Sequence, residues 1–427
     1  MIVSLVCALL AAVLSLPRPV QDDRRRETFD IVWRTVKEKH FDPQFGGVDW
    51  DRVREQYAPR AAAAASDREL YALLEEMLGE LRQSHFHIIP PEAAIDDEAA
   101  AGSPGGVGAE IKFVAGRATV ARVEPGSAAA RAGLRPGFVI TRLDGRPIAE
   151  LVTRLARSAE PPSRKQLRLA RAVQSRLGGE PGSGVRVTYL DGRDREREAA
   201  LMRHRLRGEF SPALGSFPPQ YTDFESQRLE DGLGYIRFNI FVPLVMEKVR
   251  AALRELGDAP GLVIDLRGNP GGFGAMSSGI AGLLCSKPGS LGTMQLRKGY
   301  TNFAIFPQPD PYPGAVAVLL DGASASTSEI FAGGMQELGR AVIVGERSMG
   351  AALPSVFQKL PTGALFQFAV ADFKTPKGVL IEGRGVIPDV EVKLDRASLL
   401  GGRDPQLEAA RAQIQAQLRG LKKGKKA

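Results

Sequence analysis

The sequence is poor in the residues that build metal sites and disulfides. Its 427 residues include only two cysteines and four histidines. Cys7 lies in the apolar N-terminal stretch, so removal of that stretch would leave Cys285 alone and exclude an internal disulfide. The cysteines and histidines show no zinc-finger spacing, and the carboxylates show no metal-ligand spacing. We therefore expect a protein that works without a metal or another cofactor.

Three further signatures are missing. The net charge of +8 is spread along the chain apart from a basic tail at residues 416–427, and no aromatic–basic alternation accompanies it, so we expect no nucleic-acid partner. The glycine-rich segment "RGNPGG" at 267–272 lacks the Lys-Ser/Thr of a P-loop, which argues against nucleotide binding. No Gly-x-Ser-x-Gly elbow surrounds the serines at 324–328, which disfavours an esterase or lipase of a different fold.

Residues 1–22 predict an export signal. Their apolar stretch of roughly fifteen residues is short for a membrane span and typical of a secretory peptide. No Lys or Arg precedes the stretch and no clean small-x-small cleavage site follows, so an uncleaved anchor stays open as the alternative. We expect a secreted or periplasmic protein that touches a membrane only if this segment is retained.

The pattern along the rest of the chain changes twice. Residues 24–95 predict a small helical region, with Phe29, Val32, Trp33 and Val36 on one helix face and a later helix capped by Ser66. Residues 91–105 are rich in Ala, acid, Gly and Pro, as a linker is. From 207 to 415, near-continuous apolar strands such as "LVIDLRGN" and "AVAVLLDG" alternate with helices, which predicts a mostly parallel sheet covered on both faces.

Residues 100–205 alternate short strand patterns with turns. The segments "GGVGAEI", "VEPGSAAARAGL" and "PGFVITRLDG" resemble a PDZ domain of the bacterial-protease type. Such domains bind an extended peptide by strand addition, with backbone N–H groups holding its C-terminal carboxylate. The resemblance implies that the carboxylate-binding loop consists of Gly106, Val107, Gly108 and Ala109.

The segment "DGASASTSE" at 321–329 follows an apolar strand and precedes a helix. A hydroxyl at this junction would lie at the carboxyl end of the sheet, and the helix N-terminus would favour a developing oxyanion. Geometry leaves four candidates, which are Ser324, Ser326, Thr327 and Ser328. The alternative is a simple helix cap, with Ser326 or Thr327 capping and Glu329 completing a capping box.

A nucleophilic serine needs a base, and the chain offers four histidines. His40 lies in an expected amphipathic helix, and His204 is surrounded by arginines. His85 and His87 follow a serine where a helix gives way to extended chain, so they are the better candidates. The loop at 268–272 exposes backbone N–H groups that could form an oxyanion hole or another anion site.

The PDZ-like segment followed by "DLRGNPGG" and "SASTSE…GRAVIVGE" resembles the family of C-terminal-processing peptidases and the tricorn core protease, over nearly the whole chain after residue 24. The resemblance implies an α/β core with a mixed sheet of the ClpP/crotonase type, an N-terminal helical region and an inserted PDZ domain. It implies Ser326 as nucleophile. The oxyanion hole would come from the N–H groups of Thr327 and of Gly271 or Gly272.

The branch of the family matters for the base. The tail-specific peptidases use a Ser-Lys dyad, but Ala351 occupies the lysine position in "VGERSMGAALPS". The tricorn-type branch uses a Ser-His-Ser-Glu tetrad, which matches Ser84, His85 and, in "LIEGRGVIPDVEV", Glu382. Three alternatives stay open: His87 as the base, Glu382 as a surface acid, and Ser84 as a helix cap.

The resemblance implies a serine endopeptidase that cleaves extended or unfolded polypeptides through an acyl-enzyme, with a PDZ domain that recognises substrate segments, C-terminal ones above all. The alternative is a catalytically inactive member of the same fold that binds peptides or other ligands. Polypeptide substrates are the expected partners, and the sequence leaves an oligomer open.

Overall fold

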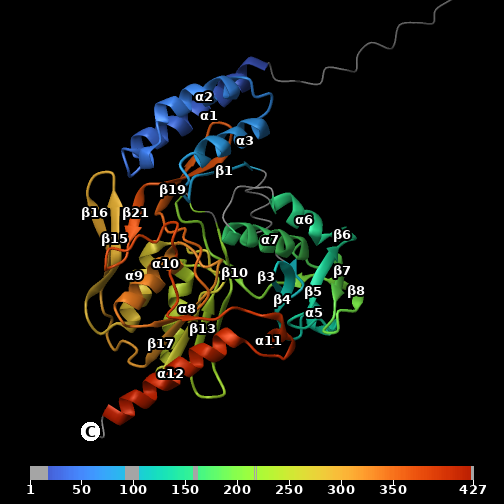
Figure 1. The fold of residues 1–427 in the computed structure, drawn as a ribbon, viewed down its shortest axis with the longest axis vertical. Helices are drawn as coiled ribbons and strands as arrows, with labels where there is room; N and C mark the ends of the chain where they lie inside the picture. Colours follow the sequence, from blue (N-terminus) through green and yellow to red (C-terminus); the bar gives the residue numbers. More distant parts are fainter. Residues whose placement is uncertain (1–17, 92–104, 157–161, 216, 218, 425–427) are drawn as a thin grey trace, which may run out of the picture.

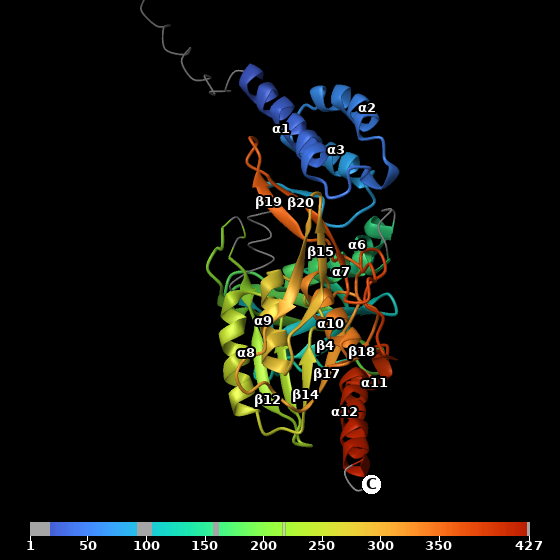
Figure 2. The ribbon, with the colours of Figure 1, turned by 90° about the vertical axis from the view of Figure 1, so that its left-hand side faces the viewer.

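A computed structural model of the chain describes residues 18–91, 105–156, 162–215, 217 and 219–424. The N-terminal helices lie at one end of the molecule, and helix α12 (Pro405–Gly424) lies at the other (Figures 1 and 2). Most of the expected signal or anchor, and most of the expected linker at 91–105, lie outside the described residues. No helix in the described ranges is both long and apolar enough to cross a bilayer.

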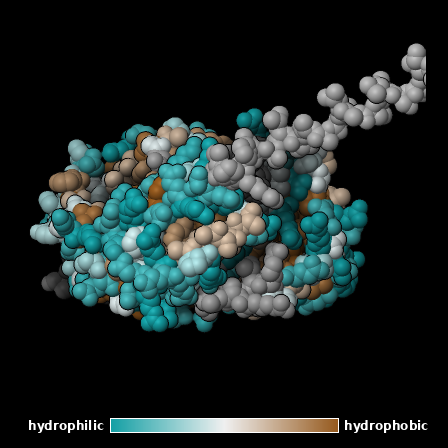
Figure 3. Space-filling view, turned by 90° about the horizontal axis from the view of Figure 1, so that it is seen from above, coloured by the Kyte–Doolittle hydropathy of each residue, from teal (hydrophilic) through white to brown (hydrophobic). Residues whose placement is uncertain are grey.

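The N-terminal region consists of helices whose apolar faces pack together. They are α1 (Arg18–Lys39), the 3-10 turn η1 (Phe45–Gly47), α2 (Trp50–Ala62) and α3 (Asp67–Gly79). Asp49 and Ser66 cap α2 and α3 by accepting hydrogen bonds from backbone N–H groups three residues on. Seen from above, this end of the molecule is covered largely by hydrophilic residues (Figure 3). His40, expected inside the first helix, lies directly after it.

A three-stranded sheet joins this region to the rest of the chain. Its strands, in spatial order, are β1 (His87–Ile89), β20 (Leu365–Ala369) and β19 (Ser355–Lys359), all antiparallel to their neighbours. Phe366 and Phe368 on β20 are buried in the same apolar cluster as the three helices. The first and last thirds of the sequence therefore share one core.

The second region is a small β domain built around a sheet with the spatial order β3-β4-β5-β7-β8. Its elements are β2 (Gly105–Gly106), β3 (Ala109–Val114), β4 (Arg117–Val123), α5 (Ala128–Arg131), β5 (Val139–Leu143), β6 (Arg146–Pro147), α6 (Ile148–Ala156), α7 (Pro162–Leu177), β7 (Gly184–Leu190), β8 (Glu196–Met202) and β9 (His204–Arg205). Helix α7 is rich in basic residues, and its Leu169, Val173 and Leu177 pack into the core of the domain.

The third region is a three-layered α/β core around a sheet with the order β12-β13-β14-β17-β18-β22. Its elements are β10 (Glu209–Phe210), β11 (Tyr221–Thr222), β12 (Phe224–Arg228), β13 (Gly234–Phe238), α8 (Pro243–Glu255), β14 (Gly261–Asp265), α9 (Gly274–Leu284), β15 (Gly289–Leu296), β16 (Tyr300–Ile305), β17 (Ala315–Leu320), α10 (Thr327–Glu337), β18 (Val342–Gly345), β21 (Ala371–Lys374), β22 (Val390–Glu391), α11 (Arg396–Leu400) and α12. Strand β12 is antiparallel to β13, and every other pairing in this sheet is parallel.

Alternate residues of the central strands face opposite layers. Leu262 and Ile264 of β14 pack in the cluster that contains helices α8 to α10, whereas Val263 packs against α12. Both faces of the parallel strands are therefore buried, which explains their nearly continuous apolar sequences. The expected fold class, an α/β core with a helical region and an inserted PDZ domain, is confirmed.

Candidate active site

The loop between β17 and α10 carries the four candidate hydroxyls. Ser324, Thr327 and Ser328 are buried, and their hydroxyls donate to the carbonyls of other loops at 2.8, 2.7 and 2.9 Å. Ser326 is partly exposed. Of the four residues, Ser326 is therefore the one best placed to meet a substrate.

Ser326 has a backbone conformation, with φ 53° and ψ −118°, that residues other than glycine rarely adopt. Such a conformation costs about 1–3 kcal/mol of strain and persists only where the surrounding structure enforces it. The N–H group of Ser326 donates to the Ala351 carbonyl at 2.9 Å and to the Glu329 carboxylate at 3.0 Å. Ser326 is also the N-cap residue of α10, so the cap and the nucleophile interpretations are compatible.

The glycine-rich loop after β14 lies against this turn. A Cβ on Gly271 would lie 2.7 Å from the Ser326 Cβ and 2.8 Å from the Thr327 nitrogen, so this close approach requires glycine. The Gly271 N–H donates to the Asn269 side chain at 2.9 Å. Within the described part of the chain, no hydrogen bond engages the N–H groups of Gly272 and Thr327. Of the three candidate donors, which are Gly271, Gly272 and Thr327, the last two therefore have backbone N–H groups available for an oxyanion.

Asn269 fixes the glycine-rich loop to the serine loop. Its side chain donates to the Phe238 carbonyl at 2.9 Å, and its carbonyl accepts from the Ser328 hydroxyl and the Ala325 N–H at 2.9 and 3.1 Å. Asn269 is not among the site residues expected from the sequence. Its position between a glycine and a proline was the available signal, because a buried asparagine in such a loop has both a donor and an acceptor to satisfy.

Ser84, His85 and Glu382 form one hydrogen-bonded chain, although Glu382 lies 298 positions beyond Ser84. The Ser84 hydroxyl lies 2.7 Å from His85 Nδ1 and 2.8 Å from Glu382 Oε2. The Ser84 N–H also donates to Glu382 Oε1, at 2.7 Å. Ser84 lies five residues after the end of α3 and therefore does not cap it.

The donors in this chain determine the histidine tautomer. Glu382 accepts from three donors, the third being the Ala352 N–H at 3.1 Å, as an ionised carboxylate can. The single hydroxyl hydrogen of Ser84 is therefore directed to Glu382. Its oxygen must then accept from the Nδ1–H of His85, which leaves the lone pair on Nε2.

The other histidines lie elsewhere. His87 lies on β1, and its Nδ1 is 3.3 Å from the Glu75 carboxylate. His40 is buried, and its Nε2 is 2.9 Å from the Gln83 side chain. Burial lowers the pKa of His40, and this effect outweighs the hydrogen bonds with Gln83 and Asp42, which raise it. His204 lies on β9, opposite Gly106 of the PDZ-like loop.

The segment Gly350–Ala352 connects the serine turn to the histidine chain. Glu329 accepts from the N–H groups of Gly350 and Ala351 at 2.7 and 2.9 Å. The next residue, Ala352, donates to Glu382. The Ser348 hydroxyl also donates to Glu329. Burial raises the pKa of Glu329 to about 7, although four hydrogen bonds lower it. The sequence pattern predicts only a helix-initiating role for Glu329, because the segment Gly350–Ala352 approaches it only in the folded chain.

An ion pair attaches the β domain to the loop that carries Ser326. Lys112 of β3 lies 2.6 Å from Asp321, and Asp321 accepts from the N–H groups of Gly268 and Ala323 at 2.9 and 3.0 Å. Burial opposes the ionisation of Asp321, but Lys112 and these N–H groups hold the pKa of its carboxyl below its usual range. Lys112 therefore contacts Asp321, which fixes the start of the glycine-rich loop at Gly268 and the start of the serine loop at Ala323.

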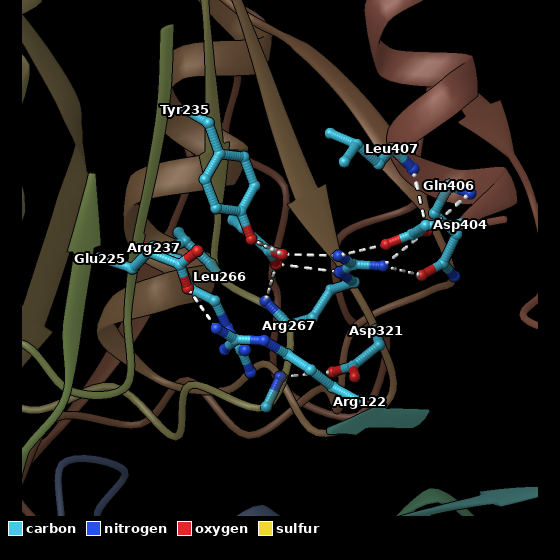
Figure 4. Close-up of polar contacts among 12 residues, drawn as sticks. Arg122, Glu225, Tyr235, Arg237, Leu266, Arg267, Asp321, Asp404, Gln406 and Leu407 are labelled. Carbon is cyan, nitrogen blue, oxygen red and sulfur yellow. Dashed lines mark hydrogen bonds and ion pairs between the residues drawn. The ribbon is translucent and has the colours of Figure 1, made fainter. Parts of the chain in front are cut away.

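A second group of charges lies beneath the glycine-rich loop (Figure 4). Asp265 accepts from Tyr235 at 2.8 Å and pairs with Arg267 at 2.6 Å, and Arg267 also reaches Asp404 of the C-terminal segment at 2.8 Å. Burial opposes the ionisation of Asp265, but Arg267 and Arg237 hold its pKa well below its usual range. This network anchors the end of β14, from which the glycine-rich loop departs.

In the PDZ-like loop, backbone groups of Val107 and Gly108 bind the rest of the β domain. Their carbonyls accept from the N–H groups of Ala129 and Glu124 at 2.9 and 2.8 Å. Gly108 has φ 74°, and a Cβ there would lie 2.2 Å from the Ser127 Cβ, so the loop conformation requires glycine. Gly106 pairs with β9, and Ala109 begins β3.

Comparison with known proteins agrees with this organisation. Three family descriptions match the chain, the Tricorn protease C1 domain at residues 21–79, the PDZ domain at 97–170 and Peptidase family S41 at 232–392. A carboxyl-terminal-processing protease of Synechocystis sp. is 28% identical over 387 residues, which cover 88% of this chain and 84% of that protein. A tricorn protease homolog of Streptomyces coelicolor is 27% identical over 90% of this chain but only 32% of its own length.

Two solved structures are similar in fold. The photosystem II D1 C-terminal processing protease has a TM-score of 0.58 at 25% identity, over 91% of this chain and 97% of that chain. The tricorn protease has a TM-score of 0.53 at 17% identity, over 92% of this chain and 37% of that chain, a likeness of fold alone. The chain therefore combines a Tricorn C1-like region, a PDZ domain and a Peptidase family S41 domain, and it is a serine-type peptidase similar to the C-terminal-processing proteases.

Proposed function

We propose that this peptidase cleaves extended polypeptides through an acyl-enzyme, with Ser326 as nucleophile and His85 as general base. The observation that carries the proposal is the hydrogen-bonded chain of Glu382, Ser84 and His85. Ala351 and Ala352, neighbours in sequence, bond to the Ser326 turn and to Glu382 respectively. The Ser326 turn and the hydrogen-bonded chain that ends in His85 are thus linked through one short segment, which supports the proposed pairing.

In the first half of the reaction, the Ser326 Oγ attacks the carbonyl carbon of the scissile bond. His85 Nε2 takes the hydroxyl proton, and the resulting imidazolium is stabilised by Glu382 through Ser84. The N–H groups of Thr327 and Gly272 would bind the oxyanion of the tetrahedral intermediate. Gly271 lets the substrate carbonyl approach closely but has its own N–H engaged by Asn269. Collapse expels the amine, which takes the proton from His85.

In the second half, a water molecule attacks the acyl carbon and gives its proton to His85. The released Ser326 oxygen then takes a proton back, which restores the resting site. No lysine is required at position 351, where the tail-specific branch has its base and this chain has alanine. A positioned base contributes roughly 10²–10⁴-fold, and one oxyanion donor roughly 10²–10³-fold.

The proposal is tested by labelling with a fluorophosphonate probe and mapping the modified peptide by mass spectrometry. We expect labelling of wild type on Ser326, none in Ser326→Ala, and strongly slowed labelling in His85→Ala and Glu382→Gln. Labelling of another serine would overturn the assignment. Absence of labelling in a folded wild type would favour the inactive binding protein. Cleavage of tributyrin without cleavage of casein would favour an esterase.

We further propose that the PDZ domain recognises C-terminal segments of polypeptide substrates, through the loop from Gly106 to Ala109 and the adjoining strand β3. The names of the relatives, which are C-terminal-processing proteases, support a substrate recognised at its end. Export to a secreted or periplasmic location, with the segment 1–22 as the signal, completes the proposal. Fractionation of cells that express the full chain tests it, because retention in the cytoplasm would contradict export.

A further inference from the structure

Strand β3 is the first strand of the five-stranded path through the PDZ sheet, so one of its edges has no neighbouring strand among the residues that the structure describes. On this edge two backbone groups are already bonded. The Gln174 side chain on α7 donates from Nε2 to the Ala109 carbonyl at 3.0 Å. The Ile111 N–H donates to Gln174 Oε1 at 3.3 Å. One carboxamide therefore bonds both to an acceptor and to a donor two residues apart on the strand edge.

A side-chain carboxamide has the same donor and acceptor groups as a peptide unit. An extended peptide adds to a strand edge by bonding its outward-facing N–H and C=O groups. On β3 these groups include the Ala109 carbonyl and the Ile111 N–H, which directly follow the loop from Gly106 to Gly108. Gln174 thus occupies the place of one peptide unit of an added strand.

The position of Gln174 allows it to leave without disturbing the fold. Helix α7 is held by Leu169, Val173 and Leu177, which are buried in the PDZ core. Gln174 itself is exposed and follows the buried Val173 on this helix, so only its side-chain carboxamide contacts β3. Rotation of its side chain into solvent would therefore uncover the edge of β3 while the helix stays in place.

We propose that Gln174 caps the peptide-binding edge of the PDZ domain and that a substrate segment must displace it to bind. The inference rests on the proposed recognition of C-terminal segments by this domain. Each hydrogen bond that Gln174 makes lowers the affinity for peptide, because an incoming strand replaces that bond and does not add to it. Gln174 selects for segments whose carboxylate and side chains supply the remaining affinity.

The test compares Gln174→Ala with Gln166→Ala in full-length chain carrying Ser326→Ala to prevent cleavage. Gln166 is the matched control, an exposed glutamine eight residues earlier on the same helix. The probe is a pool of fluorescein-labelled decapeptides with apolar C-terminal residues and free carboxylates, followed by fluorescence anisotropy. We expect Gln174→Ala to bind the pool about three- to tenfold more tightly than Gln166→Ala, from the net value of two exposed hydrogen bonds.

A second measurement needs no ligand. Hydrogen–deuterium exchange over residues 107–113 should be faster in Gln174→Ala than in Gln166→Ala, because the Ile111 amide loses its acceptor. Peptide at saturating concentration should restore protection in both proteins. Unchanged exchange would show that Gln174 does not cap the edge and would overturn the inference.

The outcomes separate the inference from the function on which it rests. Equal affinity in both proteins, or weaker binding in Gln174→Ala, would overturn the capping role while peptide recognition stands. Absence of binding in both proteins would overturn peptide recognition at this edge and the capping role with it. Fluorophosphonate labelling of Ser326 would still decide the peptidase function independently.

Discussion

The two sides of the candidate site are held together by different means. The serine side, comprising residues 268–272 and 321–329, is built from two adjacent strand–loop–helix units of the α/β core. Backbone groups and buried hydroxyls fix it. The histidine side consists of Ser84, His85 and Glu382, which three side-chain and backbone bonds hold together across 298 positions of sequence. The serine side should therefore be as stable as the core, whereas the histidine side depends on the docking of the N-terminal region.

The largest expected effect distinguishes His85, which belongs to the histidine side, from His87, which does not. His85→Ala should lower kcat/KM by about 10⁴-fold, at the upper end of the contribution of a positioned base, because nothing else would take the Ser326 proton. The free energy of unfolding should change by less than about 1 kcal/mol, since His85 is only partly buried. Peptide hydrolysis and urea unfolding measure the two quantities.

His87→Ala is the matched control for this experiment. His87 contacts Glu75 and takes no part in the chain to Glu382, so its removal should leave kcat/KM within about threefold of wild type. The opposite ranking, an inactive His87→Ala beside an active His85→Ala, would revive the alternative that His87 is the base.

The comparison also explains what the sequence could and could not predict. The serine side was predictable because it is local: an apolar strand, a loop of small residues and a helix follow one another, and the parallel sheet brings two such loops together. The choice of Ser326 among four hydroxyls depended on the family resemblance. The local pattern does not reveal that Ser324, Thr327 and Ser328 are buried against the glycine-rich loop that follows β14.

The histidine side had no local signal beyond Ser84-His85. Nothing near Glu382 in the sequence distinguishes it from a surface acid, because its partners are Ser84 and Ala352. Its assignment came from the resemblance and stays a prediction, to which the structure adds the hydrogen bonds from Ser84 and Ala352. The bonds of Glu329 to the segment Gly350–Ala352, and the bond from Gln174 to β3, were missed because each depends on a tertiary approach that residue spacing does not encode.

The second prediction concerns Glu329, which bonds both to the Ser326 turn and to the segment that reaches the histidine side. Its pKa is raised by burial from 4.5 to about 7, so the folded state binds its proton more tightly than the unfolded state does. The resulting stability is fully present below about pH 4.5 and is lost as the pH rises through 7. The loss is at most about 3 kcal/mol between pH 5 and 8.

Glu329→Gln removes this titration. The variant should show a smaller fall in the free energy of unfolding between pH 5 and 8 than wild type, measured by urea denaturation at each pH. It should also be less active at every pH, because an amide cannot accept all four of the bonds that Glu329 receives. A pH dependence identical to that of wild type would show that Glu329 does not titrate in this range.

The smallest expected effect tests whether the PDZ domain supports the serine side through the single contact between Lys112 and Asp321. Lys112→Met would leave Asp321 buried without its cation, while Asp321 still accepts from Gly268 and Ala323. We expect kcat to fall about tenfold, corresponding to about 1.4 kcal/mol of lost positioning. Arg122→Ala is the matched control, because Arg122 joins the same domain to Glu225 of the core through a more exposed ion pair that does not include Asp321. Such a pair contributes at most about 1 kcal/mol to stability, so kcat should stay within about twofold. Equal losses in the two variants would mean that PDZ docking as a whole, and not the contact with Asp321, supports the serine side.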